Sequence, residues 1–298
     1  MELVTIVIPT YKRSEKIERA LKSAVSQTYK RIEIVVVDDN ANNPEERIKT
    51  EKIVRKFNNI KLIQNSRNLG GALTRNVGIN NSNGKYIAFL DDDDEFINDK
   101  IEKQMKLIKE KEKAGHKVGL VYCYKRIINE RGKTVFIGKR NDEGNCLYEH
   151  MIECVETTST WLCSKKALLD VGMFENVKAH QDNILLLKLL ASGYEIFRVP
   201  EVLLNFYLHN GNGITNKDEK YIEYTKVLIN YKRKYYSKLD NKQIKNVEYA
   251  NSCQLLELYK KNNMKKDYIH EMKTAILCKP FKKHNLRLIY QLLFWKEK

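Results

Sequence analysis

Short apolar runs alternate with segments of helical periodicity over the first ninety residues, and this alternation limits the folds that the chain can adopt. Four such runs are rich in β-branched or other apolar side chains: residues 3–8, 32–37, 60–63 and 86–90. Such runs are typical of strands buried on both faces, and Pro9 is expected to end the first of them. Helical spacing follows Ser14, the expected N-cap, and Pro44. The repeat predicts a parallel sheet with helices on both faces.

Two of the predicted strands end in aspartates. These are Asp38 and Asp39 after the second run, and Asp91, Asp92, Asp93 and Asp94 after the fourth. The carboxyl ends of parallel strands meet at one edge of a sheet, where open α/β sheets bind ligands. Adjacent carboxylates repel one another unless a cation lies among them, and Mg2+ and Mn2+ prefer oxygen ligands. A solvated acidic loop is the alternative, but the position after a buried strand favours a binding site.

The composition limits the class of protein. A chain of 298 residues with 42% hydrophobic content can bury the core of one large domain, with or without an appendage. Its net charge of +16 favours a polyanionic partner: nucleic acid, anionic lipid or a phosphate-bearing ligand. The six cysteines have no metal-site spacing, which favours buried, reduced thiols. The first residues lack a signal-peptide pattern, and no apolar run has the length of a membrane span, so we expect a cytoplasmic protein.

The pattern changes after the fourth strand. Helices are expected near residues 101–108, 165–171 and 181–192, and strands near 118–124, 126–137, 157–163 and 202–208. From about residue 216 the chain becomes rich in Lys and Tyr and helical in period. We therefore expect a domain over residues 1–216 and a basic helical region over 217–298.

Five motifs together resemble the inverting family 2 glycosyltransferases with the GT-A fold. They are Val7-Ile8-Pro9-Thr10-Tyr11, Val36-Val37-Asp38-Asp39-Asn40, Arg75-Asn76-x-Gly78, Phe89-Leu90-Asp91-Asp92-Asp93-Asp94, and Gln181-Asp182 with Gly193 and Pro200. They occur in the family's order over residues 3–210. The resemblance implies a Rossmann-like α/β fold with a mixed, mainly parallel sheet flanked by helices. It also implies a nucleotide-binding half, 1–95, and an acceptor-binding half, 96–216, followed by the C-terminal helical extension.

The resemblance implies a role for each matching residue. Asp39 would bind the base, with the whole nucleotide-binding set being Pro9, Thr10, Tyr11, Asp38, Asp39, Arg75, Asp91 and Asp92. Arg75 would face the diphosphate and Asp92 the ribose. The alternatives are a loop acid that caps a backbone amide, for Asp38, and a solvated side chain, for Arg75.

The same resemblance implies a metal site and a general base. Asp93 would bind Mn2+ or Mg2+ together with Asp91 and His209, although a lone histidine is more often structural. Asp182 would accept the proton of the acceptor hydroxyl, and its alternative role is to complement a helix N-terminus. Gln181 stands where the family usually has Glu, so any role of that first acid is lost.

The expected reaction is transfer of one hexosyl or N-acetylhexosaminyl group from a nucleotide-sugar, UDP-sugar in the first instance, to a hydroxyl of a glycan or lipid-linked acceptor in bacterial surface polysaccharide synthesis. The Gln-x-x-Arg-Trp motif of processive members is absent from the sequence. A sugar-phosphate nucleotidyltransferase is an alternative, but it would need a Gly-rich phosphate loop after the first strand. A nucleic-acid-binding protein is another alternative, and no motif of that class is present.

The basic tail contains an amphipathic segment, residues 281–295. Leu286, Ile289, Tyr290 and Leu293 share one helical face, flanked by lysines and Arg287. This pattern is typical of helices that lie on an anionic membrane surface, and it predicts a peripheral location at the inner face of the cell membrane. Packing against its own domain, or against a second subunit in a homodimer, is the alternative.

Overall fold

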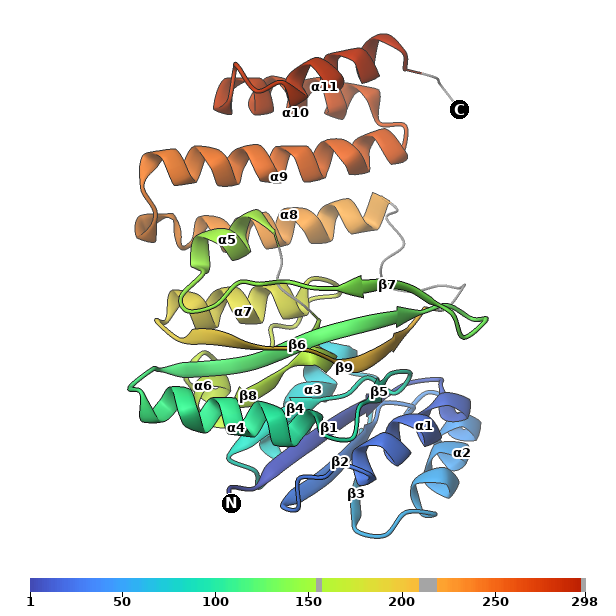
Figure 1. The fold of residues 1–298 in the computed structure, drawn as a ribbon. Helices are drawn as coiled ribbons and strands as arrows, with labels where there is room; N and C mark the ends of the chain where they lie inside the picture. The colour runs from blue at the N-terminus through green and yellow to red at the C-terminus, as the bar shows by residue number, and fades with distance from the viewer. Residues whose placement is uncertain (154–156, 209–218, 296–298) are drawn as a thin grey trace. The chain divides into compact units, whose positions relative to one another are not determined.

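A computed structural model describes residues 1–153, 157–208 and 219–295, which form two compact units (Figure 1). The first unit comprises Met1–Cys146 and Val155–Gly211, and the second comprises Leu147–Cys154 and Asn212–Lys298. The domain boundary expected near residue 216 falls outside the described residues.

Four parallel strands form one half of the sheet in the first unit. They are β1 (Val4–Thr10), β2 (Ile32–Asp38), β3 (Ile60–Gln64) and β4 (Tyr86–Phe89), in the order β3-β2-β1-β4. The alternation of apolar runs predicted this half. The prediction that the first strand ends at Pro9 is wrong, because β1 pairs with β2 as far as Thr10 and Asp38. The pairing of β1 with β4 stops at Val7 and Phe89. Pro9 lies beyond Val7, so its missing N–H group leaves no hydrogen bond unmade towards β4.

The other half of the sheet is mixed. From β4 the order continues through β8 (Leu162–Ser164), β6 (Val118–Ile128), β9 (Glu195–Tyr207) and β5 (Glu95–Phe96), while β7 (Thr134–Gly138) pairs with β6. Only β6 and β9 in this half run parallel.

Two strand predictions in this half need correction. Residues 118–128 form one continuous strand, not two strands that meet near residue 125. The last strand begins at Glu195, not at residue 202, and its register with β6 shifts between Val199 and Val202. Pro200 lies in this shift, where the sheet tolerates a residue without an N–H group.

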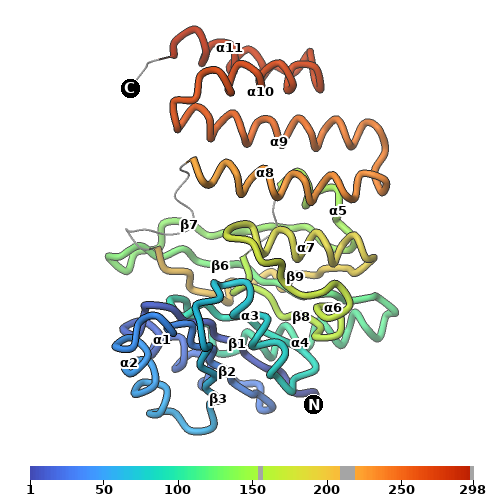
Figure 2. Tube along the Cα trace, turned by 180° about the vertical axis from the view of Figure 1, so that it is seen from behind, coloured from blue at the N-terminus to red at the C-terminus, as the bar shows by residue number. Residues whose placement is uncertain are grey.

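Helices cover both faces of the sheet (Figures 1 and 2). One face carries α1 (Ser14–Val25), α2 (Pro44–Val54) and α4 (Lys100–Lys113), and the other carries α3 (Gly71–Asn80), α6 (Lys165–Asp170) and α7 (Gln181–Ala191). A short 3-10 turn, Thr158–Thr160, precedes β8. Arg13 occupies the N-cap position of α1, so the prediction of Ser14 is off by one residue. The core joins sheet residues such as Ile6 with Leu21 and Met105.

The second unit is helical, as the sequence predicted. It contains α5 (Leu147–Ile152), α8 (Glu219–Arg233), a 3-10 turn (Tyr236–Lys238), α9 (Asn241–Lys261), α10 (Lys265–Cys278) and α11 (His284–Leu293). A capping box between Asp240 and Gln243 begins α9. Tyr268 is completely buried among these helices, and Tyr249 donates a hydrogen bond to Asn285 over 3.0 Å. Within the described residues, no helix combines the length and apolar character needed to cross a bilayer.

Candidate active site

The acidic turn lies at the carboxyl edge of the parallel strands. Leu90 follows β4 and donates its N–H to the carbonyl of Val7 in β1 over 3.0 Å, and Asp91 to Asp94 come next. Asp38 ends β2 opposite Thr10, the last residue of β1. Because β1 lies between β2 and β4, the structure brings both groups of aspartates to one edge, as the sequence indicated.

The four aspartates of the turn differ in their exposure. The side chains of Asp91 and Asp93 are 28% and 13% exposed, whereas Asp92 and Asp94 are 4% and 1% exposed as residues. Burial raises the pKa of Asp92 to about 7, although the charge of Arg13 opposes this shift. Burial also raises the pKa of Asp94, with further contributions from Asp91 and Asp93. The turn therefore presents Asp91 and Asp93 to solvent and keeps the other two inside.

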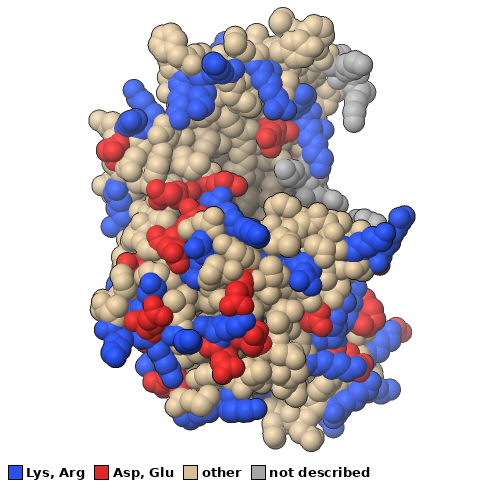
Figure 3. All heavy atoms as spheres, viewed as in Figure 1, with Lys and Arg blue, Asp and Glu red and all other residues tan. Residues whose placement is uncertain are grey.

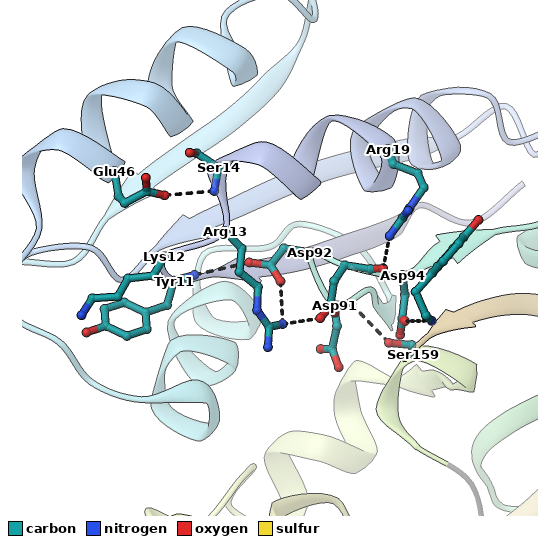
Figure 4. A network of polar contacts seen from close by, with 12 residues as sticks. Tyr11, Lys12, Arg13, Ser14, Arg19, Glu46, Asp91, Asp92, Asp94 and Ser159 are labelled. Atoms are coloured by element: carbon teal, nitrogen blue, oxygen red, sulfur yellow. Dashed lines mark hydrogen bonds and ion pairs between the residues drawn. The ribbon is translucent and has the colours of Figure 1, made fainter. Parts of the chain in front are cut away.

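Two arginines on or beside α1 hold this turn (Figure 4). Arg13 Nη1 lies 3.2 Å from Asp92 Oδ1 and 2.5 Å from Asp93 Oδ2. Arg19 donates to the backbone carbonyl of Asp93, and its guanidinium stacks 3.5 Å from the ring centre of Tyr207. Sequence reasoning assigned neither arginine to the site. Arg13 stands two residues after Tyr11 in the loop that follows β1, and this proximity is the one signal that could have indicated it.

Arg75 connects the acidic turn to the start of α7. Its Nη2 lies 2.5 Å from Asp91 Oδ1, and its Nη1 donates to Gln181 Oε1 over 3.2 Å. A Cβ atom on Gly71 would lie 3.2 Å from the same Nη1, a tight contact that glycine avoids. With both ends of its guanidinium in contact with protein groups, Arg75 does not match the alternative of a solvated arginine.

Asp182 follows Gln181 in the first turn of α7. Its Oδ1 accepts a hydrogen bond from the backbone N–H of Asn183 over 2.8 Å, and its residue is partly exposed. Asp182 is therefore a partly accessible carboxylate, one residue from the amide that contacts Arg75.

Asp39 holds a loop in place. Its Oδ1 accepts from Asn65 Nδ2 and Leu69 N, both at 2.8 Å, and its Oδ2 accepts from Asn68 Nδ2 and Gly70 N, both at 2.9 Å. The residue is 2% exposed. These contacts fix residues 65–70, the segment that leads into α3 and Arg75. The base-binding role implied for Asp39 stays a prediction.

The remaining residues of the predicted nucleotide set lie at the same edge. Asp38 is fully buried, accepts from Asn40 N over 2.8 Å and lies 3.5 Å from Arg47 Nε, a contact pattern that agrees with the loop-capping alternative. Thr10 is 2% exposed and Pro9 is partly buried. Tyr11 is 36% exposed, which leaves its ring accessible.

The chemistry of Asp91 and Asp93 fits a hard divalent cation, because they are the two partly exposed carboxylates of the turn and such cations prefer oxygen ligands. Arg75 and Arg13 contact these oxygens and already supply positive charge at the turn. Over the described ranges, no three His, Cys, Asp or Glu side chains are grouped as a complete metal site. His209, the third ligand implied by the resemblance, lies outside the described residues.

Known sequences that are similar to this chain are glycosyltransferases. The family described as "Glycosyl transferase family 2" matches residues 5–171, more than half of the chain. The amylovoran biosynthesis glycosyltransferase AmsB of Erwinia amylovora is 28% identical over 222 residues, which cover 72% of this chain and 73% of that protein. An uncharacterized glycosyltransferase of Rickettsia conorii is 30% identical over 221 residues, covering 73% of this chain but 35% of the longer relative.

Solved structures share the fold. S. aureus TarS in complex with UDP-GlcNAc matches with a TM-score of 0.64 at 17% identity and covers 93% of this chain and 79% of that one. The mannosyltransferase PcManGT from Pyrobaculum calidifontis, in complex with GDP-Man and Mn2+, matches with a TM-score of 0.58 at 17% identity, covering 99% and 88% of the two chains. At this identity the likeness shows the GT-A-like fold alone.

Proposed function

This chain belongs to glycosyl transferase family 2, and from that premise we propose that it transfers one sugar from a UDP-sugar to a hydroxyl of a glycan or lipid-linked acceptor, with inversion. The observation that carries the proposal is the double contact of Arg75, which joins Asp91 of the acidic turn to Gln181 beside Asp182. Donor-side and acceptor-side groups of such a reaction would then face one another across a single edge of the sheet. Membership of the family favours sugar transfer over the synthesis of sugar nucleotides or the binding of nucleic acid.

The donor would lie with its nucleoside near Tyr11 and Asp39 and its diphosphate near Arg75. Tyr11 is accessible enough to contact a base, and the guanidinium of Arg75 is placed to pair with phosphate oxygens. A divalent cation bound by Asp91 and Asp93 would supply positive charge. That charge would stabilise the negative charge that develops on the oxygen of the departing diphosphate. Arg13 contacts both Asp92 and Asp93 in the structure. When Asp93 binds the cation, Arg13 would give up its contact with Asp93 and keep the one with Asp92.

Asp182 would be the general base. As the acceptor oxygen attacks the anomeric carbon, its proton passes to the Asp182 carboxylate, and the bond between that carbon and the diphosphate oxygen breaks on the opposite face. Attack and departure on opposite faces produce inversion. The position of Asp182 supports this role, because its partly exposed carboxylate lies in the first turn of α7, next to the Gln181 side chain that contacts Arg75.

The similar proteins support a donor class and a biological setting. The name of the AmsB relative supports a role in surface polysaccharide synthesis. The UDP-GlcNAc and GDP-Man in the structural neighbours support a hexosyl or N-acetylhexosaminyl donor.

The proposal is tested with a panel of UDP- and GDP-sugars, mixed acceptors and Mn2+, by measuring the released nucleotide. The wild type is expected to turn over one donor class. Asp182→Asn should keep donor affinity, measured by calorimetry, and lose transfer by about a hundredfold or more, because an amide cannot accept the proton. Glu45→Gln is the matched control, because Glu45 is an exposed acid in the first turn of α2, and this variant should keep most of the activity. An active Asp182→Asn variant would remove Asp182 as the base, and a panel without any turnover would contradict the reaction itself.

A further inference from the structure

Helix α11 is apolar on two sides, and the second unit covers one of them. Leu288 is 4% exposed on the inner side, where Tyr268 donates a hydrogen bond to its carbonyl over 3.1 Å. On the outer side, Leu286 and Leu293 are 71% and 75% exposed. A helix with apolar side chains on opposite sides normally has both sides covered. The outer side of α11 therefore lacks a covering surface within the described residues.

Two more large apolar side chains, close to α11 in the sequence, are also exposed. Phe281, in the connection from α10, is 99% exposed, and Leu277 at the end of α10 is 81% exposed. We define the apolar face by its residues: Leu277, Phe281, Leu286, Ile289, Tyr290, Leu293 and Phe294, all of which are large and exposed. Single exposed apolar residues are ordinary on proteins, but a group of this size marks an interaction surface.

The charge around the apolar face indicates its partner. Residues 272–295 contain five basic side chains and no Asp or Glu: Lys273, Lys279, Lys282, Lys283 and Arg287. Figure 3 shows Lys and Arg side chains over the helices of this unit, with uncharged atoms and a few Asp and Glu side chains between them. A second copy of the same face would bring like charges together, which is unfavourable. An anionic surface would satisfy both the charge and the apolar side chains.

We propose that the apolar face lies in the interface of an anionic phospholipid bilayer. Phe281, Leu286 and Leu293 enter the boundary between headgroups and acyl chains, and the basic side chains contact the lipid phosphates. The inference does not depend on the proposed reaction, because every residue that carries it belongs to the second unit.

Sedimentation of the full chain with vesicles tests the inference. Vesicles of phosphatidylcholine mixed with phosphatidylglycerol should bind the chain about tenfold more tightly than phosphatidylcholine alone, and added salt should weaken the binding. The double variant Leu286→Ser/Leu293→Ser should lose about tenfold or more of the affinity, because two exposed apolar anchors are removed. Lys282→Glu/Lys283→Glu should abolish the preference for phosphatidylglycerol.

The matched control is Ile48→Ser/Leu169→Ser, which changes two side chains of the first unit that are 53% and 47% exposed. This variant should bind vesicles like the wild type. Thermal unfolding checks that each variant is folded. The proposal would be overturned if the wild type did not bind the mixed vesicles, or if the control variant lost as much vesicle affinity as Leu286→Ser/Leu293→Ser. It would also be overturned if the chain formed a dimer that Leu286→Ser/Leu293→Ser dissociates and bound no vesicles.

Discussion

The four adjacent aspartates of the acidic turn differ in how deeply their side chains are buried. Asp92 and Asp94 are nearly inaccessible, and burial raises the pKa of both, whereas Asp91 and Asp93 remain in contact with solvent. A run of four acids in a sequence does not show which carboxylates face water, because that depends on the path of the turn. The structure therefore makes Asp91 and Asp93 the accessible pair, and it places Asp92, predicted near the ribose, against Arg13 and the N–H of Tyr11.

Arg75 allows a test at the scale of one residue. Replacement by alanine removes the charge that contacts both Asp91 and Gln181, so kcat/KM for sugar transfer should fall by about a hundredfold, and UDP affinity should fall as well. Steady-state kinetics and calorimetry with UDP measure the two effects. Arg55→Ala is the control, since Arg55 is an exposed arginine at the C-terminal end of α2. Unchanged kinetics in Arg75→Ala would contradict a role at the donor diphosphate.

Lys100 predicts a pH dependence of stability. It is fully buried, donates to Gln104 Oε1 over 2.8 Å and lies 4.1 Å from the ring centre of Phe96. Burial lowers its pKa from 10.5 to about 8. The folded chain thus releases this proton before the unfolded chain does, so the folded state gains stability as the pH rises from 8 towards 10.5.

Urea unfolding at pH 7 and pH 10 measures this effect when the wild type is compared with Lys100→Met. The free energy of unfolding of the wild type, relative to that of the variant, should increase by up to about 3 kcal/mol over this interval. Other titrating groups affect both proteins alike and cancel in the difference. A difference that does not change with pH would show that Lys100 titrates normally.

At the scale of elements, the site depends on how closely α3 packs on β1. A Cβ atom on Gly78 would lie 2.3 Å from Val7 Cγ1, so only glycine permits the observed distance between this helix and the sheet. Val7 belongs to the strand that also carries Thr10, and α3 carries Arg75. The glycine therefore positions the guanidinium relative to the carboxyl edge of the strands.

Gly78→Ala should lower the free energy of unfolding by about 1–3 kcal/mol, even though alanine favours helices, because the methyl group forces α3 away from β1. The same substitution in a Val7→Ala background should have a smaller effect, since the clashing Cγ1 is absent. Urea unfolding of the four proteins gives the coupling between the two positions. Equal effects in both backgrounds would show that α3 accommodates the methyl group in another way.

At the scale of the whole molecule, the sequence predicted the first unit better than the second. Its parallel strands could be predicted because strands buried on both faces are almost entirely apolar. The continuity of β6 was missed because Lys125 and Arg126 interrupt its apolar pattern, and the start of β9 was missed because Pro200 suggested an end. In the second unit, the helical class followed from periodicity, but the grouping of α5 with α9 rests on contacts such as Tyr148 with Asn246, 98 residues apart.

The candidate site, too, could be predicted from the sequence only in part. Acids at the ends of strands could be placed at one edge, because topology alone brings them together. The contacts of Arg13 and Arg19 with the acidic turn span 74 to 80 residues and depend on side-chain conformation, which no local pattern records. The likeness in motif order indicated both Asp182 and Arg75, but the contacts of Arg75 with Asp91 and Gln181 could be found only in three dimensions.

The four hydrogen bonds that Asp39 accepts also bear on the kinetics of donor capture. Because these bonds already fix residues 65–70, the conformational entropy of the loop before α3 is lost during folding and not during binding. A nucleotide donor bound at this edge, as we propose, would meet residues 65–70 in a preformed conformation. Its association rate would then be set by diffusion and by the positive charge of the chain, with no waiting time for this loop to close.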